Sequence, residues 1–273
     1  MTHAVAMPED LHAVAAEKAA SLIMRIGKTE WNGKTIWVKK AVPPKMTVWN
    51  RLQLGISNLA KMPVLRPTSN PGGKEGLEIE ARRIAKFREA GFIAPAVLGL
   101  TEEWIVLEDL GEMVERKLQK DKALMPSDVR RIVLQCAEAV AKLHMSGNVH
   151  GRAKLNDLVL TPDGSIGFID FEEDLENCGI PLETLKAREL WLFLCTTARF
   201  AAKCPRITEE SLAAYLAIAN EAETLRELKK LLRFLRPCKV IVSPFITLMK
   251  GDAQRAYLAT SVLLSAPRLK TAT

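Results

Sequence analysis

Two short stretches carry the most informative residues of the chain: His150-Gly151-Arg152-Ala153-Lys154-Leu155-Asn156-Asp157 and Ile169-Asp170-Phe171-Glu172. An apolar triplet follows the first stretch, and a Pro162-Asp163-Gly164 turn leads toward the second. Asp170 comes directly after an apolar run, where a carboxylate is costly unless it binds a metal or accepts several hydrogen bonds. Asp157 supplies a second hard oxygen donor. We therefore expect a pair of metal ligands, against the alternative that both carboxylates merely cap turns.

Strand patterns come first along the chain, and helix patterns follow. An Asn32-Gly33 turn between β-branched and aromatic residues predicts a hairpin over residues 28–41. The other predicted elements are helices over residues 11–25 and 75–90 (ending at Gly91), strands at 93–98 and 104–107, a helix capped by Ser127, a hairpin over 149–171, and helices from 181 to 266. This order is typical of an α+β architecture in two lobes.

The predicted lobes divide the chain into three parts. Residues 1–25 form an N-terminal helical extension, and residues 26–111 form a small β-rich N-lobe. Residues 112–273 form a mostly helical C-lobe that carries both informative loops. About half of the residues are hydrophobic, which is enough for a large core.

The two stretches resemble the catalytic loop and metal-binding loop of the protein-kinase-like fold. In that fold His-x-Asp is followed five residues later by Asn, and a strand later by Asp-Phe-Gly. Here Arg152 stands in place of the catalytic Asp, Asp157 in place of the Asn and Glu172 in place of the Gly. The resemblance runs from about residue 28 to residue 199. It is closest to bacterial lipopolysaccharide-core and Kdo kinases and to the small Bud32-like kinases, and it implies a two-lobed fold that uses ATP and Mg²⁺.

The resemblance also implies roles for individual residues. Lys39, with Lys40 as the fallback, would contact the α/β-phosphates, and Glu80 would hold that lysine. Asp157 and Asp170 would bind Mg²⁺. The remaining assignments are His150, which would brace the catalytic loop, Arg152, which would stabilise transferred charge, and Glu189, which would support the loop from a helix.

The stretch Leu107-Glu108-Asp109-Leu110-Gly111 resembles the hinge of small-molecule kinases. Backbone groups at such a hinge read adenine, so Glu108 and Leu110 are the candidate positions for binding the nucleotide base. An ordinary strand end would carry a similar sequence, so the motif is weak by itself.

Two departures from the kinase pattern bear on activity. A Gly-rich phosphate loop is missing from the predicted hairpin, which offers only Gly27 and Gly33. Arg152 removes the residue that orients the acceptor, although both metal positions keep oxygen ligands. A positioned base contributes roughly 10²–10⁴-fold to the reaction rate, but the loose transition state of phosphoryl transfer depends little on a base. An active phosphotransferase is therefore our first expectation, and a regulatory pseudokinase that binds a protein partner is the alternative.

Charge and a leucine stripe direct the expectation about the acceptor. Lys and Arg exceed Asp and Glu by seven, which favours an anionic partner. The leucines at 225, 228, 231, 232 and 235 share a helical face flanked by basic residues, with Pro237 as the predicted end of the helix. Such a helix lies on an anionic membrane or packs into the C-lobe. We expect an envelope lipid or lipid-linked saccharide (Kdo, heptose or sphingolipid type) as acceptor, with a Bud32-like protein kinase or ATPase as an alternative.

The remaining composition indicates the compartment. Five cysteines without C-x-x-C spacing are typical of reduced thiols. Neither a signal peptide nor an apolar run of roughly 20 residues is visible. The basic and aromatic residues do not interleave as in a nucleic-acid stacking surface, so nucleic acid is not an expected partner. We expect a cytoplasmic protein, with peripheral contact at the inner membrane as an open possibility.

Overall fold

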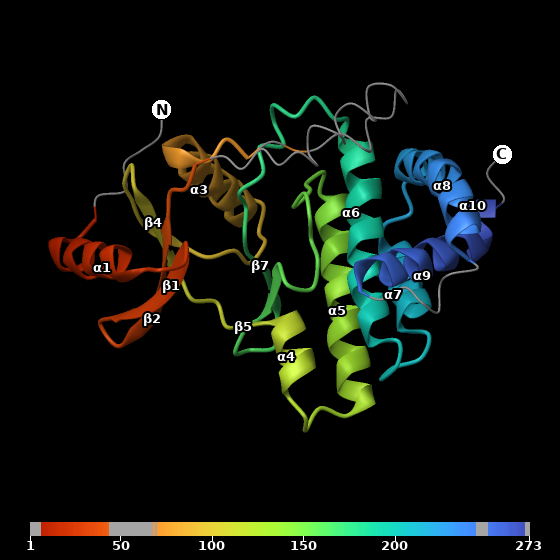
Figure 1. Cartoon of the computed structure of the whole chain (residues 1–273), viewed down its shortest axis with the longest axis horizontal. Coiled ribbons are helices and arrows are strands. Elements are labelled where there is room, and N and C mark those ends of the chain that lie inside the picture. Colours follow the sequence, from red (N-terminus) through yellow and green to blue (C-terminus); the bar gives the residue numbers. More distant parts are fainter. Residues whose placement is uncertain (1–6, 44–67, 69, 244–250, 271–273) are drawn as a thin grey trace. The chain divides into compact units, whose positions relative to one another are not determined.

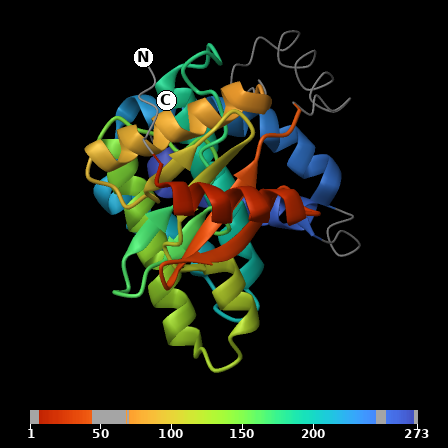
Figure 2. The same cartoon turned by 90° about the vertical axis from the view of Figure 1, so that its left-hand side faces the viewer.

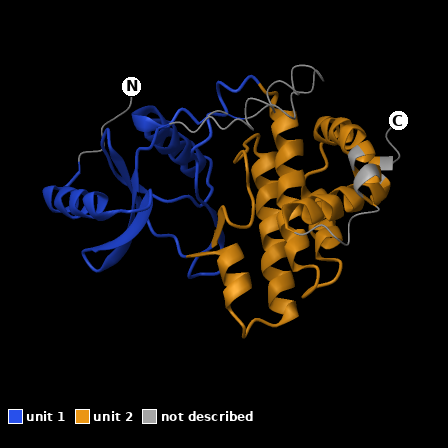
Figure 3. Ribbon diagram, viewed as in Figure 1, with its two compact units in different colours: residues 1–111, 160–179 blue, residues 112–159, 180–273 orange. Residues whose placement is uncertain are grey.

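The computed structural model describes residues 7–43, 68, 70–243 and 251–270. The chain divides into two compact units, one made of residues 1–111 and 160–179 and the other of residues 112–159 and 180–273 (Figure 3). One boundary between the units lies after residue 111. The segment 160–179, which carries Asp170, groups with the first unit instead of the helical lobe.

The first unit is built on an antiparallel sheet in the order β1-β2-β4-β3 (Figure 1). Asn32 and Gly33 link the first two strands with φ values of 48° and 72°, the left-handed conformation that a tight hairpin turn requires. Local turn chemistry therefore fixes the predicted hairpin. The elements of this unit are α1 (Glu9–Ser21), β1 (Ile26–Trp31), β2 (Lys34–Lys40), α3 (Gly73–Glu89), β3 (Val97–Leu100), β4 (Trp104–Glu108) and β7 (Ile166–Phe168).

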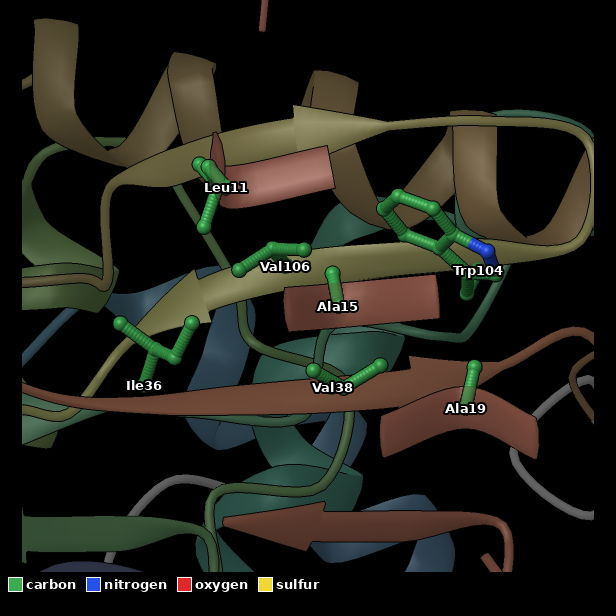
Figure 4. Close-up of a cluster of buried hydrophobic side chains, with 7 residues drawn as sticks. All are labelled: Leu11, Ala15, Ala19, Ile36, Val38, Trp104 and Val106. Carbon is green, nitrogen blue, oxygen red and sulfur yellow. The ribbon is translucent and has the colours of Figure 1, made fainter. Parts of the chain in front are cut away.

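Helix α1 covers one face of this sheet. Alternate residues of a strand point to opposite faces, and Val38 pairs directly with Val106 of β4. The close-up in Figure 4 shows these side chains meeting α1 in one cluster, which consists of Leu11, Ala15, Ala19, Ile36, Val38, Trp104 and Val106. The indole Nε1 of Trp31 also donates to Asp10 Oδ2 at 2.8 Å. In Figure 2 this helix crosses in front of the strands.

Lys39 lies on the opposite face of the sheet, one residue beyond Val38. Glu80 of α3 reaches Lys39 there, so α3 covers the face that α1 leaves open. Phe87 of α3 packs against Phe171, with ring centroids 4.6 Å apart, and against Phe168, at 5.8 Å. These contacts are the physical reason that segment 160–179 belongs to the first unit, because they bury its aromatic side chains.

The second unit is mainly helical. Its elements are β5 (Glu112–Met113), α4 (Val114–Lys120), α5 (Pro126–Met145), most of β6 (Leu158–Leu160), α6 (Leu182–Thr197), the 3-10 turn η2 (Ala198–Phe200), α7 (Ile207–Ile218), α8 (Ala222–Val242), α9 (Asp252–Ser265) and α10 (Pro267–Lys270). Helix α5 packs against α7, and α6 packs against α8 and α9. Helix α5 buries an apolar stripe made of Val129, Ile132, Val133, Cys136, Val140 and Leu143.

Two predicted helix boundaries in this unit were wrong. Ser127 is not the cap of α5, because the helix begins at Pro126 and follows Met125. Asp128, at the third position of the helix, accepts the amide of the cap residue Met125 at 3.3 Å, which is one half of a capping box. Pro237 does not end α8 but lies inside it. The helix continues through Pro237 to Val242, although proline cannot donate a backbone hydrogen bond.

The leucine stripe of α8 is a packing surface. Leu228, Leu231 and Leu232 are buried, while the neighbouring Arg226 and Arg233 are exposed. The face toward α6 and α9 is therefore already covered within the unit. Of the two alternatives for this helix, packing into the C-lobe agrees with the structure, because the residues that would insert into a membrane are enclosed. Among the described helices, none combines the length and hydrophobicity that crossing a bilayer demands.

Candidate active site

Lys39 is the centre of the candidate site in the first unit. Its Nζ lies 2.8 Å from Glu80 Oε1 and 3.1 Å from Asp170 Oδ1, and it also forms an ion pair with Glu172. Three residues expected from sequence therefore meet, and the fallback Lys40 does not contact Glu80 in the contacts that the structure describes. The side chains of Lys39 and Glu80 are 5% and 1% exposed, so this is a buried ion pair.

Burial and charge compete for the protons of this cluster. Burial disfavours the Lys39 ammonium, but the carboxylates of Glu80, Asp170 and Glu172 overcome that effect and raise its pKa. Burial also raises the pKa of Glu80, although Lys39 opposes this, and the two neighbouring carboxylates push in the same direction as burial. One ammonium is shared among three carboxylates, so the cluster has a surplus of negative charge that a cation would relieve.

The backbone of the metal-loop residues is held in an uncommon conformation. Asp170 has a φ of 70°, in the left-handed region that aspartate tolerates better than most residues. The buried guanidinium of Arg83 donates to the carbonyls of Phe171 at 3.2 Å and Glu173 at 3.1 Å. Phe171 is fully buried and anchors the same segment. These contacts fix the Asp170 carboxylate beside Lys39 while leaving it one-third exposed.

Glu172 makes contacts that the sequence did not predict. Its Oε2 accepts from Arg25 Nη1 at 2.6 Å and from Asn70 Nδ2 at 2.8 Å, in addition to the ion pair with Lys39. The next acid along the chain, Glu173, accepts the Thr68 hydroxyl at 2.7 Å. Asp174 caps the turn of Asn177.

The hinge candidates lie at the end of β4. Glu108 is the last residue of the strand, and its carboxylate accepts the Ala96 amide at 3.1 Å. Leu110 is half-buried. Between them, Asp109 binds Trp37 Nε1 and Lys28 Nζ, both at 2.9 Å. The side chains therefore tie the strand end to the hairpin, and the structure leaves adenine binding by the backbone at Glu108 and Leu110 as a prediction.

The catalytic-loop candidates belong to the second unit and are braced by Glu189 of α6. Its carboxylate is fully buried and accepts the amides of Gly151 at 2.6 Å and His150 at 3.3 Å. Burial alone would raise the pKa of Glu189, but hydrogen bonding and the charges of His144 and His150 lower it below its usual range. His144 is positioned in turn by the Tyr215 hydroxyl, 2.6 Å from its Nδ1.

Asp157 is buried at the end of this loop, and Arg152 is half-buried two residues after His150. The amide of Lys154 donates to Asp157 Oδ2 at 3.4 Å, and the Lys154 ammonium lies 4.0 Å from the same oxygen. Lys154 is thus a cation beside Asp157, the predicted metal ligand. Lys154 itself was not among the site residues predicted from the sequence. Its signal was a lysine three residues before a carboxylate in a motif already singled out.

The protein's donor set suits a hard divalent cation. Mg²⁺ is commonly held by one or two carboxylates together with substrate phosphates. In the part of the chain that the structure describes, three or more His, Cys, Asp or Glu side chains do not gather into a metal-binding group. Asp170 belongs to the first unit and Asp157 to the second, and their role as ligands of Mg²⁺ stays a prediction.

A strand lysine held by a helical glutamate, with an aspartate at the lysine, is typical of a phosphotransferase of the kinase class. Known proteins agree with this assignment. A probable serine/threonine-protein kinase BUD32 homolog from Archaeoglobus fulgidus is 30% identical over 165 residues, which span 56% of this chain and 72% of that protein. The chain therefore belongs to the protein-kinase-like superfamily.

Two further similarities are more limited. The human hormonally up-regulated neu tumor-associated kinase is 38% identical over 68 residues, which cover 25% of this chain and 9% of that kinase. A solved structure of a MAP kinase from Leishmania major matches 94% of this chain and 87% of its own, at 14% identity and a TM-score of 0.39. A search of protein-family models gave no match.

Proposed function

We propose that this protein is an ATP-dependent kinase of the Bud32-like type, which transfers a phosphoryl group to a hydroxyl of a protein. The observation that carries the proposal is the buried Lys39–Glu80 pair with Asp170 at 3.1 Å from the same ammonium. Phosphoryl transfer depends mainly on positioning and charge stabilisation, and this cluster supplies both in a fixed geometry.

Each residue then has a defined task. Lys39 binds the α/β-phosphates, and Glu80 holds the ammonium in place. Asp157 and Asp170 hold the divalent cation, which when bound neutralises the phosphate charge. His150 and Glu189 keep the catalytic loop in shape, and Arg152 stabilises negative charge on the transferred group.

The acceptor class follows from the relative and from α8. The archaeal relative carries the name of a serine/threonine-protein kinase, which supports a protein hydroxyl as the acceptor. The expected envelope lipid or saccharide rested on the resemblance to lipopolysaccharide-core and Kdo kinases and on the basic leucine helix, whose apolar residues Leu228, Leu231 and Leu232 are buried. A lipid acceptor and a contact with the inner membrane therefore become outcomes of the test, not the proposal.

The test is transfer of label from γ-labelled ATP with Mg²⁺ or Mn²⁺ to three acceptors: the protein itself, a bacterial protein extract and a lipid extract. Asp170→Asn serves as the inactive comparison, and Glu102→Gln, an exposed carboxylate of the same unit, is the matched control. Label in protein that is lost only in Asp170→Asn supports the proposal. Label in lipid alone would refute the protein acceptor, and no label in any acceptor would refute the kinase.

A non-catalytic regulatory role is the second candidate, and one contact favours it. The Glu172 carboxylate forms an ion pair with the Lys39 ammonium, and Arg152 stands where a catalytic base is expected. Arg152→Asp separates the two functions. A variant that gains transfer from an inactive parent supports a pseudokinase, whereas a variant that loses transfer shows that the arginine takes part in the reaction.

A further inference from the structure

The Glu172 carboxylate lies in a ring of donors that resembles an anion-binding site. Arg25 Nη1 donates to Glu172 Oε2 at 2.6 Å, Asn70 Nδ2 donates to the same oxygen at 2.8 Å, and Lys39 Nζ pairs with Oε1. The Glu172 side chain is only 12% exposed. Two cations and an amide thus converge on one acidic side chain within the first unit.

Arg25 is held in this position by the sheet. Its carbonyl accepts the amide of Lys40 at 2.8 Å, and its Nε donates to the Lys40 carbonyl at 3.2 Å. These two bonds align the residue just before β1 with the end of β2, next to Lys39. The remaining face of the guanidinium points to Glu172, so the arginine is fixed before any ligand arrives.

The β1–β2 hairpin lacks the Gly-rich loop that would bind phosphates through backbone amides. The β1–β2 turn has only Asn32 and Gly33, and Asn32 is exposed. A phosphate chain at Lys39 therefore needs other donors nearby. A guanidinium suits this role because its planar donors match phosphate and carboxylate oxygens equally well.

We propose that Arg25, Lys39 and Asn70 form the polyphosphate subsite of the nucleotide, and that Glu172 occupies this subsite until the nucleotide displaces it. The inference rests on the proposed kinase function and adds its phosphate-binding residues and an internal competitor. The ligand is a nucleoside di- or triphosphate. Its terminal phosphates take the place of the Glu172 oxygens, and Glu172 moves out to solvent.

The test is equilibrium binding of ATP and adenosine, measured by calorimetry on the full chain with EDTA present so that metal ligation does not contribute. Glu172→Gln removes the competing charge and is expected to bind ATP about tenfold more tightly. Arg25→Gln is expected to bind ATP about tenfold more weakly, the order of magnitude of one charge-assisted hydrogen bond. Both variants bind adenosine as the parent does, because adenosine carries no phosphate.

Two exposed residues of the same unit give matched controls, Glu102→Gln and Arg82→Gln, and both are expected to bind ATP as the parent does. Equal or weaker ATP binding by Glu172→Gln would overturn the inference. So would a loss of adenosine binding in Arg25→Gln, which would indicate a structural role. If the parent binds ATP and all four variants match it, the nucleotide site stands and this subsite falls. If no protein binds ATP in EDTA, this subsite falls, whereas the kinase itself is judged by the transfer of label with Mg²⁺ or Mn²⁺.

Discussion

Replacing Lys39 with methionine tests the energetics of the buried cluster. Lys39→Met keeps the length of the side chain but removes the only ammonium that contacts Glu80 in the described structure. Glu80 is 1% exposed, and its Oε2 has no hydrogen-bond partner among the described residues. The substitution therefore leaves a buried carboxylate without a counter-charge, while the charges of Asp170 and Glu172 further disfavour its ionised form.

The expected loss is large. Removing one partner of a buried ion pair costs about 3–5 kcal/mol, and each kcal/mol lowers the melting temperature of a chain of this size class by about 2–4 °C. We expect a melting temperature about 6–20 °C below that of the parent. Thermal unfolding followed by circular dichroism at pH 7 measures this. A loss below about 1 kcal/mol would refute the view that the pair is buried.

The double variant Lys39→Met/Glu80→Gln provides the control and a pH test. Burial raises the folded-state pKa of Glu80 above its ordinary value of 4.5. Such a group contributes its full stability below pH 4.5 and loses it as pH rises through the folded-state pKa. The gap in stability between the single and double variants is therefore wide at pH 7 and closes as pH falls toward 4.5. A gap that does not change with pH would contradict the view that Lys39→Met leaves Glu80 charged and without a counter-charge.

Three other substitutions test separate features. Gly111→Ala should lower the free energy of unfolding in urea by about 2 kcal/mol or more, because Gly111 has a φ of 133° and a new Cβ would lie 2.5 Å from the Leu160 carbonyl oxygen. The control Gly164→Ala has a positive φ but open space around it, and should cost about 1 kcal/mol. Equal losses in the two variants would argue against the close approach at Gly111. Pro237→Ala should raise the melting temperature, since proline inside a helix costs about 3 kcal/mol, and no gain would contradict a continuous α8. Glu189→Gln should weaken the loss of stability at acid pH. The lowered pKa of Glu189 contributes stability above pH 4.5, and this contribution is lost as the pH falls below 4.5. If the free energy of unfolding of the variant falls with acid as steeply as that of the parent, the buried hydrogen bonds of Glu189 would be contradicted.

Local sequence signals predicted the parts of the fold that local chemistry decides. The Asn32-Gly33 turn demands positive φ at both residues, and the structure has it. The predicted helix 75–90 agrees with α3 to within two residues and stops before Gly91, whose φ is 84°. The order of the motifs along the sequence also predicted that Lys39 pairs with Glu80, and their charged atoms lie 2.8 Å apart.

Other features depended on contacts between distant residues. The leucine stripe of α8 showed that one face is covered, but periodicity does not say whether a lipid or a neighbouring helix covers it. Arg25 lies in no motif, and only its pairing with Lys40 in the sheet brings it to Glu172, 147 residues later in the sequence. Pro237 indicates a helix end by its intrinsic propensity, yet α8 continues past it to Val242.

The discontinuity of the first unit has a consequence for biosynthesis. A ribosome releases residues 1–111 first, but the unit is complete only after residue 179 has left the exit tunnel. Until then Phe87 lacks the partners Phe168 and Phe171, and Lys39 has Glu80 as its sole acidic neighbour from this cluster. The sheet and α1 can assemble early, whereas the acidic loop arrives late and closes the unit. Truncation between residues 111 and 160 would leave nascent chains with an exposed aromatic helix face, a natural target for chaperones.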